Sequence, residues 1–341
     1  MNKIRVIQYG VGPIGAGIVR LMLQKPELEI VGAIDVDPQK AGKDLGTVVG
    51  AKGPIGVKIS ADSQAVLRAG ADVVVHTTSS YLTSVSSQLV ECLKAHTHVV
   101  STCEELSYPF RKHPDLSRQL DQVAREHGVA LLGTGVNPGF AMDKLILTLA
   151  TACQYVTKAS AHRVVDASKR RQPLQKKVGS GMTVEEFRAQ VAAGVIKHHG
   201  LPESVAMVAD SLGLRVDRIV ESIEPVVAKE TVRSEYFEVP AGKVVGVSQV
   251  ALGLAGSEEN VSLKLEMYLG APGSVDTASI KGTPDLNLTI PGGIHGDLAT
   301  AAIAVNCIPA MFDVKPGLRT SKDMPMCFFP GTRMVKVAEV A

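Results

Sequence analysis

Residues 4–15 read Ile-Arg-Val-Ile-Gln-Tyr-Gly-Val-Gly-Pro-Ile-Gly, a short apolar run followed by the glycine spacing G-x-G-x-x-G. Apolar residues then recur at helical spacing as far as Met22, and a second apolar run, residues 28–34, ends at Asp35. A strand, a glycine-rich turn, a helix and a second strand that ends in an acidic residue about 20 positions later form the fingerprint of a dinucleotide-binding unit. The sequence therefore predicts a Rossmann-type domain that binds NAD or NADP.

Each part of this turn has a physical role in the predicted site. Gly10 permits the tight turn, Gly12 lets a pyrophosphate approach the backbone, and Gly15 allows close packing of the helix on the strand. Pro13 and Ile14 open the helix, whose first N–H groups and positive dipole end face the phosphates. The alternative is a plain strand-to-helix turn, which the surrounding pattern makes the weaker interpretation.

Asp35 bears on the choice between the two cofactors. Its carboxylate is expected to accept hydrogen bonds from the adenosine ribose hydroxyls, which favours NAD, and to repel the 2′-phosphate of NADP. Lys40 and Lys43 follow closely and offer positive charge to that phosphate. The sequence leaves NAD, NADP or both as the cofactor.

The composition excludes several classes of protein. The chain has 341 residues, 45% of them hydrophobic, and a formal net charge of +2, so a large core is expected and a nucleic-acid partner is not. No apolar run approaches the ~20 residues that span a bilayer, so no membrane partner is expected. Five scattered cysteines indicate reduced thiols in a cytoplasmic protein, and no metal site is expected because the pair His198-His199 lacks nearby ligands.

The remaining pattern predicts an α/β fold of two domains. Strands alternate with helices up to about residue 140, which indicates a doubly wound parallel sheet. The expected organisation is a Rossmann domain over 1–140, completed by 296–341, and a second α+β domain over 141–295 with a mostly antiparallel sheet for substrate binding and dimerisation. In the second part we expect a helix over 141–156, strands over 159–166, 214–219, 231–239, 243–252, 261–268, 277–281 and 286–290, and a helix over 297–310.

Polar residues follow the predicted strands of the first sheet at their carboxyl ends, where ligands of open α/β sheets bind. Thr77, Thr78 and Ser79 follow the strand 73–76 and are candidates to contact the nicotinamide half of the cofactor. The alternative is a polar loop whose side chains bond to its own backbone.

Glu104 and Glu105 follow the next strand, residues 98–101. Adjacent side chains of an extended segment point in opposite directions, so at most one of these carboxylates should face the site. An isolated pair of this kind is more often a solvated or capping pair than a catalytic one. Asn137 and Arg163 are further candidates for substrate contacts, with a turn-forming residue and a surface ion pair as the respective alternatives.

Several longer stretches are more specific than the glycine turn. They are VVHTTSSYL (74–82), STCEELSYP (101–109), GTGVNPGF (133–140), RVVDAS (163–168), LQKKVGSG (174–181), GGIHGD (292–297) and NCIP (306–309). With the turn, they resemble the 2,4-diaminopentanoate dehydrogenase and native amine dehydrogenase family almost from end to end. The resemblance implies a fold like that of dihydrodipicolinate reductase, whose own K-x-D-x-P-S-G-T stretch is absent here.

The resemblance implies an NAD(P)-dependent amine dehydrogenase that is a homodimer. Such enzymes convert a small primary amine or non-α amino acid, such as 2,4-diaminopentanoate or 4-aminopentanoate, to a ketone and ammonia, or run the reductive amination in reverse. It assigns proton transfer to Glu104, whose pKa is expected to rise in an apolar pocket. It places Asn137, Phe140 and Arg163 near the substrate and Asn306 near the nicotinamide carboxamide.

Two other functions stay open at this point. One is an oxidoreductase of the same fold that acts on a hydroxyl group, like a homoserine dehydrogenase, for which a Lys or His acid–base group would be more natural. The other is a nicotinamide-nucleotide-binding regulator without turnover, which would need no carboxylate at the hydride-transfer position. A glutamate at residue 104 suits iminium chemistry better than either alternative. Val165 is apolar where some relatives have a polar residue, which leaves room for a plain aliphatic ketone.

Overall fold

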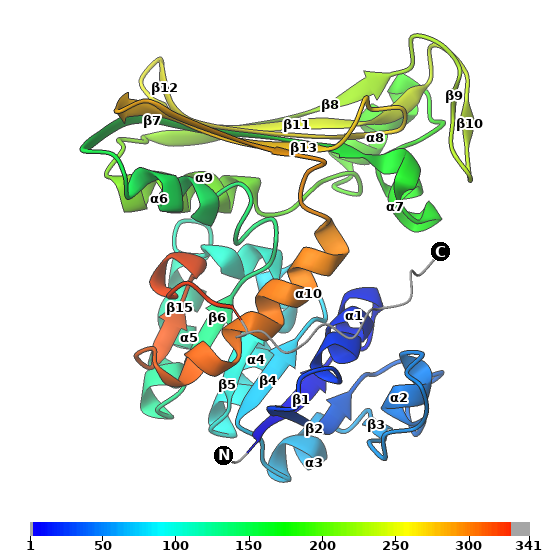
Figure 1. Ribbon diagram of the computed structural model, residues 1–341, viewed down its shortest axis with the longest axis vertical. Coiled ribbons are helices and arrows are strands. Elements are labelled where there is room, and N and C mark those ends of the chain that lie inside the picture. Colours follow the sequence, from blue (N-terminus) through cyan, green and yellow to red (C-terminus); the bar gives the residue numbers. More distant parts are fainter. Residues whose placement is uncertain (1–2, 329–341) are drawn as a thin grey trace. The chain divides into compact units, whose positions relative to one another are not determined.

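A parallel sheet in the order β15-β6-β5-β4-β1-β2-β3 forms the centre of the first unit of the chain (Figure 1). The computed structural model describes residues 3–328. Every neighbouring pair of strands in this sheet is parallel, as expected for a Rossmann-type sheet. Its strands are β1 Ile4–Tyr9, β2 Leu28–Ile34, β3 Ile59–Ser60, β4 Val73–His76, β5 His98–Ser101, β6 Ala130–Gly133 and β15 Gly317–Arg319.

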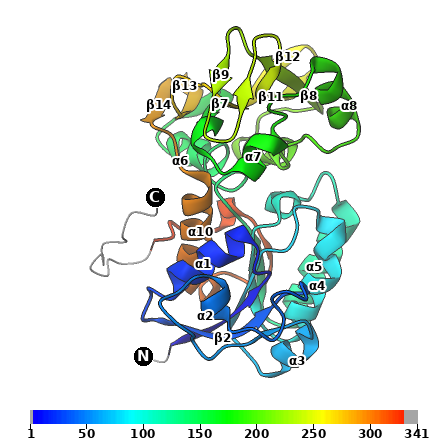
Figure 2. The ribbon, with the colours of Figure 1, turned by 90° about the vertical axis from the view of Figure 1, so that its right-hand side faces the viewer.

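Helices cover both faces of this sheet because alternate strand residues point to opposite sides. One apolar cluster joins Val73 and Val75 to α1 (Pro13–Met22) and α10 (Gly296–Cys307). The other joins Val74 to α4 (Leu82–Lys94) and α5 (Pro114–Glu126), and Figure 2 shows these two pairs of helices on opposite sides of the strands. The shorter elements of this unit are α2 Leu45–Val48, α3 Ser63–Arg68, η1 Glu104–Ser107, η3 Pro309–Phe312 and η4 Ser321–Asp323.

The second unit is built on a mixed sheet in the order β14-β13-β7-β12-β11-β8. Its strands are β7 Tyr155–Asp166, β8 Arg218–Val227, β11 Val244–Ala255, β12 Glu258–Tyr268, β13 Val275–Thr283 and β14 Leu286–Pro291. All neighbours are antiparallel except β7 and β12. The other elements are α6 Lys144–Ala150, η2 Ala167–Lys169, α7 Gln172–Lys177, α8 Val184–Ala192, α9 Leu201–Leu212 and the short hairpin of β9 Val232–Arg233 and β10 Glu238–Val239.

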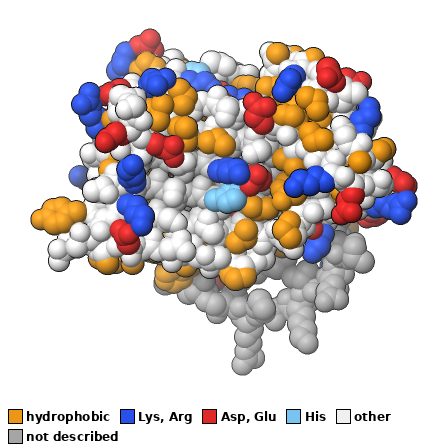
Figure 3. Space-filling model, turned by 90° about the horizontal axis from the view of Figure 1, so that it is seen from above, with side chains coloured by type: hydrophobic (Ala, Val, Ile, Leu, Met, Phe, Trp, Pro, Cys, Tyr) orange, Lys and Arg blue, Asp and Glu red, His pale blue; other side chains and the backbone are white. Residues whose placement is uncertain are grey.

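One face of this mixed sheet is covered by helices. Gly253 of β11 lies against Val205 of α9, and Leu263 and Leu265 of β12 are buried on the same face. Residues that alternate with them, among them Val250 and Leu252, are half-buried. Figure 3 shows a surface on which hydrophobic, basic and acidic side chains are interspersed.

The described chain divides into residues up to Gly135 together with those from Gly296 onward, and Val136–His295. The first domain boundary that we expected, at residue 140, lies a few residues after the observed one. Of the expected C-terminal segment 296–341, residues 329–341 lie outside the described residues. The α/β fold class with a parallel Rossmann sheet and a second α+β unit is confirmed.

Some predicted elements of the second unit were wrong in extent. The helix expected over 141–156 covers only Lys144–Ala150, because Asp143 caps its start and β7 already begins at Tyr155. The strand expected from residue 214 begins at Arg218. Helix α9 was not predicted, since most of its side chains are buried and it lacks the one-sided apolar pattern of a surface helix.

Candidate active site

The glycine turn between β1 and α1 is shaped by very close contacts. A Cβ atom at Gly15 would lie 2.1 Å from the carbonyl oxygen of Gly10 and 2.7 Å from Oγ1 of Thr77. A Cβ at Gly10, which has a φ of +89°, would lie 2.7 Å from the carbonyl oxygen of Thr77. The packing of the first unit therefore requires glycine at both positions, as the fingerprint predicts.

Gly12 is different, because none of the described residues requires it to be glycine. It has an ordinary φ of −74°, and a Cβ built there would meet no atom of residues 3–328 within 4 Å. The residue is the N-cap of α1, a helix with no side-chain cap and no acidic residue in its first turn. An N-terminus that is open in this way fits the pyrophosphate of a dinucleotide, which needs backbone N–H groups and a close approach. These residues therefore fit the expected cofactor, with Pro13 and Ile14 in the first turn.

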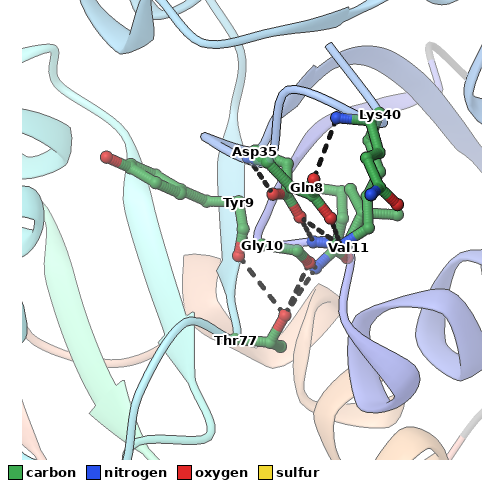
Figure 4. Close-up of polar contacts among 9 residues, drawn as sticks. Gln8, Tyr9, Gly10, Val11, Asp35, Lys40 and Thr77 are labelled. Carbon is green, nitrogen blue, oxygen red and sulfur yellow. Dashed lines mark hydrogen bonds and ion pairs between the residues drawn. The ribbon is translucent and has the colours of Figure 1, made fainter. Parts of the chain in front are cut away.

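A buried layer of hydrogen bonds supports the turn from the sheet side (Figure 4). Nε2 of Gln8 donates to the carbonyl oxygen of Gly10 at 2.8 Å and to Oγ1 of Thr77 at 3.0 Å. The Thr77 hydroxyl in turn donates to the same Gly10 oxygen at 2.8 Å. Thr77 therefore helps to hold the glycine turn in place, and its hydroxyl bonds to that turn rather than to the backbone of its own loop. Its expected contact with nicotinamide stays a prediction.

Asp35 lies at the end of β2 and is bonded to the glycine turn, as Figure 4 shows. Its Oδ2 accepts a hydrogen bond from the Val11 N–H at 2.7 Å, and its Oδ1 accepts one from Asp37 N–H at 2.9 Å. Nζ of Lys40 lies 3.3 Å from Asp35 Oδ2 and 3.3 Å from Asp37 Oδ2. Lys40 is thus paired with both of these acidic residues.

A buried histidine joins the loops that follow β4 and β5. Nδ1 of His76 lies 3.0 Å from Oγ of Ser101, and Nε2 lies 2.9 Å from Oε1 of Gln88 and 3.0 Å from Oγ1 of Thr78. Oγ of Ser101 also accepts from Cys103 N–H at 3.1 Å. Burial lowers the pKa of His76 to about 4, so the ring is neutral at neutral pH. This network fixes Thr78 and the backbone that leads into Glu104, a role for His76 that the sequence pattern did not indicate.

The two glutamates after β5 are in different surroundings. Glu105 is 4% exposed, and its Oε2 accepts from Leu82 N–H at the start of α4 at 2.8 Å. Its Oε1 lies 2.6 Å from Nζ of Lys112, and Oε2 lies 3.1 Å from Nε2 of His113. Burial raises the pKa of a carboxyl, but the bonds from Lys112 and Leu82 outweigh it and hold the pKa of Glu105 below its ordinary value. Glu105 is therefore a structural anion at a helix N-terminus.

Glu104 begins η1, directly after β5, and is half-buried. Its backbone position is fixed from two sides, since Glu105 N–H donates to the Ser80 carbonyl at 3.2 Å and the Cys103 thiol lies 3.4 Å from the same oxygen. Ser79 lies in the loop before α4, with its hydroxyl accepting from Tyr81 N–H at 3.3 Å. The carboxyl edge of the sheet thus carries Glu104 together with the loop of residues 77–80.

The remaining predicted residues are divided between the two units. Asn306 lies on the last turn of α10 in the first unit and is half-buried. Asn137, Phe140 and Arg163 belong to the second unit. NH1 of Arg163 donates to both oxygens of Asp276, at 2.8 and 2.7 Å, and NH2 donates to a backbone carbonyl at 2.5 Å. Arg163 is thus in a buried ion pair rather than in the surface ion pair considered from the sequence.

The described residues, 3–328, contain no cluster of three or more His, Cys, Asp or Glu side chains arranged to hold a metal ion. Within the same range no helix is long and apolar enough to cross a membrane.

Replacing Gly12 by alanine is expected to weaken cofactor binding while the protein still folds. The new methyl group meets no atom of the described residues, but it would stand in the expected approach of the pyrophosphate. We expect NADH to bind about tenfold more weakly or worse, measured by fluorescence titration, with a loss of stability of about 1 kcal/mol or less. Gly15→Ala is the matched control, because its methyl group clashes with Gly10 and should lower the melting temperature. Unchanged NADH affinity in Gly12→Ala would contradict this account.

Replacing Glu105 by glutamine is expected to destabilise the protein by about 2 kcal/mol, or roughly 4–8 °C in melting temperature. The substitution removes the charge that pairs with Lys112 and with the N-terminus of α4. Because the folded-state pKa is lowered, this stabilisation is present above the ordinary pKa of glutamate and is lost as the pH falls through the lowered value. The difference from the unsubstituted protein should therefore shrink in acid. Glu104→Gln, measured alongside, should change the melting temperature less, and equal losses would refute the distinction.

Family models match both parts of the chain. Residues 140–337 match the 2,4-diaminopentanoate dehydrogenase C-terminal domain, and residues 4–104 match the N-terminus of dihydrodipicolinate reductase. A 2,4-diaminopentanoate dehydrogenase of Acetoanaerobium sticklandii is 31% identical over 338 residues, which cover 96% of this chain and 94% of that protein.

Two amine dehydrogenases are also similar over almost the whole chain. One from Streptomyces virginiae is 23% identical and covers 95% of this chain and 96% of its own length. The solved structure of the enzyme from Mycobacterium smegmatis has 28% sequence identity and a TM-score of 0.81, covering 96% of this chain and 97% of that one. The chain therefore belongs to the 2,4-diaminopentanoate dehydrogenase family of amine dehydrogenases.

Proposed function

We propose that this protein catalyses the reversible oxidative deamination of a small primary amine or non-α amino acid, of the 2,4-diaminopentanoate or 4-aminopentanoate kind. The products are a ketone, ammonia and reduced NAD or NADP. The observation that carries the proposal is Glu104 at the carboxyl edge of a sheet whose glycine turn fits a dinucleotide, in a chain 31% identical to a 2,4-diaminopentanoate dehydrogenase.

In the proposed reaction the nicotinamide, when bound, accepts the hydride from the carbon that carries the amine. Glu104 first takes a proton from the substrate ammonium group and passes it to solvent, so that the carboxylate is restored beside a neutral amine, which can lose hydride to give an iminium ion. The carboxylate then stabilises this cation and takes a proton from the water that attacks it. It returns a proton to the nitrogen as the carbon–nitrogen bond breaks. The reaction as a whole balances. The substrate in its ammonium form, the oxidised cofactor and one water molecule give the ketone, a free ammonium ion, the reduced cofactor and one proton.

NAD is the favoured cofactor in this proposal, and NADP is used less well. The carboxylate of Asp35 can accept hydrogen bonds from ribose hydroxyls while it holds the Val11 N–H, but it repels a 2′-phosphate. Lys40 would have to leave its two acidic partners to pair with that phosphate. The support is electrostatic and comes from the first unit alone.

For the substrate, the surroundings of Arg163 support a weakly held or absent carboxylate. Its guanidinium is already paired with Asp276, and the neighbouring inward residue Val165 is buried and apolar. Thr78, Ser79 and Asn306 are proposed to contact the cofactor, and Asn137, Phe140 and Arg163 to line the substrate site.

We also propose a cytoplasmic homodimer formed through the second unit. Among the described residues, α6 and α9 contact the mixed sheet on one face, while Val250 and Leu252 on the other face are half-buried. A sheet face of this kind with apolar residues is typical of an interface between subunits.

The test is an assay of reduced cofactor with NAD and NADP against 2,4-diaminopentanoate, 4-aminopentanoate, short alkylamines, homoserine and short alcohols. Reduction with one or more amines, and at least about tenfold higher kcat/KM with NAD than with NADP, is expected, since one repelled phosphate corresponds to about 1.4 kcal/mol or more. Reduction with homoserine or alcohols, and none with amines, would replace the proposal by a hydroxyl-acting enzyme. Cofactor binding without any turnover would favour a regulator.

A further inference from the structure

Oδ1 of Asn137 and Nε2 of His198, both in the second unit, are among the buried polar atoms that have no hydrogen-bond partner within residues 3–328. Asn137 is only 9% exposed. Most buried polar atoms in folded proteins are paired, so an unpaired one commonly marks the place of a ligand atom or an ordered water.

The ring of His198 is bonded to the same loop that carries Asn137. Its imidazole donates a hydrogen bond to the backbone carbonyl of Asn137. Since Nε2 has no partner, the proton of this bond is on Nδ1, and Nε2 of the neutral ring has a free lone pair. Burial, together with the positive charges of Lys177 and Arg163 and with His199, lowers the pKa of His198 to about 3. The ring is therefore neutral at neutral pH, and Nε2 is a hydrogen-bond acceptor.

The backbone of His198 is held from the sheet. Oε1 of the fully buried Gln249 accepts from His198 N–H at 2.9 Å, and Nε2 of Gln249 donates to the His198 carbonyl at 2.7 Å. The same Nε2 also donates to Oε1 of Glu221, at 2.9 Å, and Nζ of Lys197 pairs with the other oxygen of that carboxylate. The segment before α9 is therefore fixed to β11 and β8.

The loop of Asn137 is fixed as well. Oδ2 of the buried Asp143 accepts from Gly139 N–H at 2.7 Å and from the Ser204 hydroxyl at 2.7 Å. Gly200 packs on Pro138 so closely that a Cβ there would lie 2.4 Å from a ring carbon of the proline. Two acceptor atoms on segments held in this way are preorganised, which is what a specific binding position requires.

We infer that Asn137 Oδ1 and His198 Nε2 form an acceptor subsite for a hydroxyl or amino group that the substrate carries away from its reacting amine. This inference rests on the proposed function and adds a recognition element to it. A carboxylate brings only acceptor atoms and cannot satisfy a neutral imidazole Nε2, whereas O–H and N–H groups can. His198 thereby becomes a specificity-determining residue of a site for which the sequence pointed only to Asn137, Phe140 and Arg163.

The test compares three substrates that differ at one carbon: 4-aminopentanoate, 2,4-diaminopentanoate and 4-amino-2-hydroxypentanoate. With the unsubstituted protein, at least one of the two donor-bearing substrates should have a kcat/KM about 10–100-fold above that of 4-aminopentanoate, because the latter leaves the acceptors unpaired. The amino and hydroxy compounds distinguish which donor the subsite takes. Equal values for all three substrates would overturn the inference and show that only water occupies the subsite.

The variant His198→Leu should reduce this ratio to within about threefold, while the adjacent control His199→Leu should keep it. His198→Gln, which retains an acceptor, should restore a preference of about fivefold or more and guards against misfolding of the leucine variant. A preference that survives in His198→Leu would also overturn the inference. If 4-aminopentanoate is oxidised without any preference, only the subsite fails. If the unsubstituted protein oxidises no amine, the proposed function fails and the subsite with it.

Discussion

The contact between Gly15 and the carbonyl oxygen of Gly10 brings α1 against β1 so closely that a single methyl group would not fit. This approach sets the position of the helix N-terminus, and with it the place where phosphates can be bound. Gln8 and Thr77 fill the space beneath the turn with hydrogen bonds, so the turn is tied to β4 as well as to β1. Farther along the same edge of the sheet, the turn that carries Glu104 is held by separate bonds to Ser80 and Leu82.

The two adjacent glutamates, Glu104 and Glu105, have different surroundings. Glu105 is turned into the first unit, where it satisfies the start of α4 and pairs with Lys112. That bonding holds the short turn η1 in place and thereby fixes the backbone of Glu104. In the proposed mechanism Glu104 carries the proton, because the reaction needs a carboxylate that can change its protonation and Glu105 is held ionised by its partners. The two adjacent carboxylates would then have complementary roles, one structural and one reactive.

Local sequence patterns predicted the first unit well, because glycine spacing and short apolar runs mark its strands and its first turn. The glycine spacing and the apolar runs of β1, β2, β4 and β5 were all visible in the sequence, and the structure has them. Helix α9 was missed because it is buried on most sides, although Pro202 near its start and Gly213 at its end mark its limits. The helix expected over 141–156 was too long, because an apolar run does not by itself distinguish a helix from a following strand.

The residues of the candidate site also divide into those that local sequence patterns predict and those that only contacts across the fold bring into place. The glycine turn and Asp35 were predicted from spacing alone, while the sequence favoured neither glutamate until the family resemblance was considered. The partners of Glu105 are Leu82, Lys112 and His113, which tertiary folding brings together, and no spacing rule predicts them. His198 was dismissed as a metal ligand, and its position beside Asn137 depends on a buried glutamine of β11. Interactions across the fold, rather than motifs, decide these roles.

In the proposed reaction Glu104 carries the proton during amine oxidation. The most direct measurement is single-turnover oxidation of NADH by a ketone and ammonium, in a stopped-flow instrument, with the unsubstituted protein and Glu104→Gln, together with NADH affinity on the same samples. If Glu104 has this role, NADH affinity should change by less than about threefold while the rate of NADH oxidation falls by roughly 10²–10⁴-fold. A Glu104→Gln protein that oxidises NADH within about tenfold of the unsubstituted rate would contradict it.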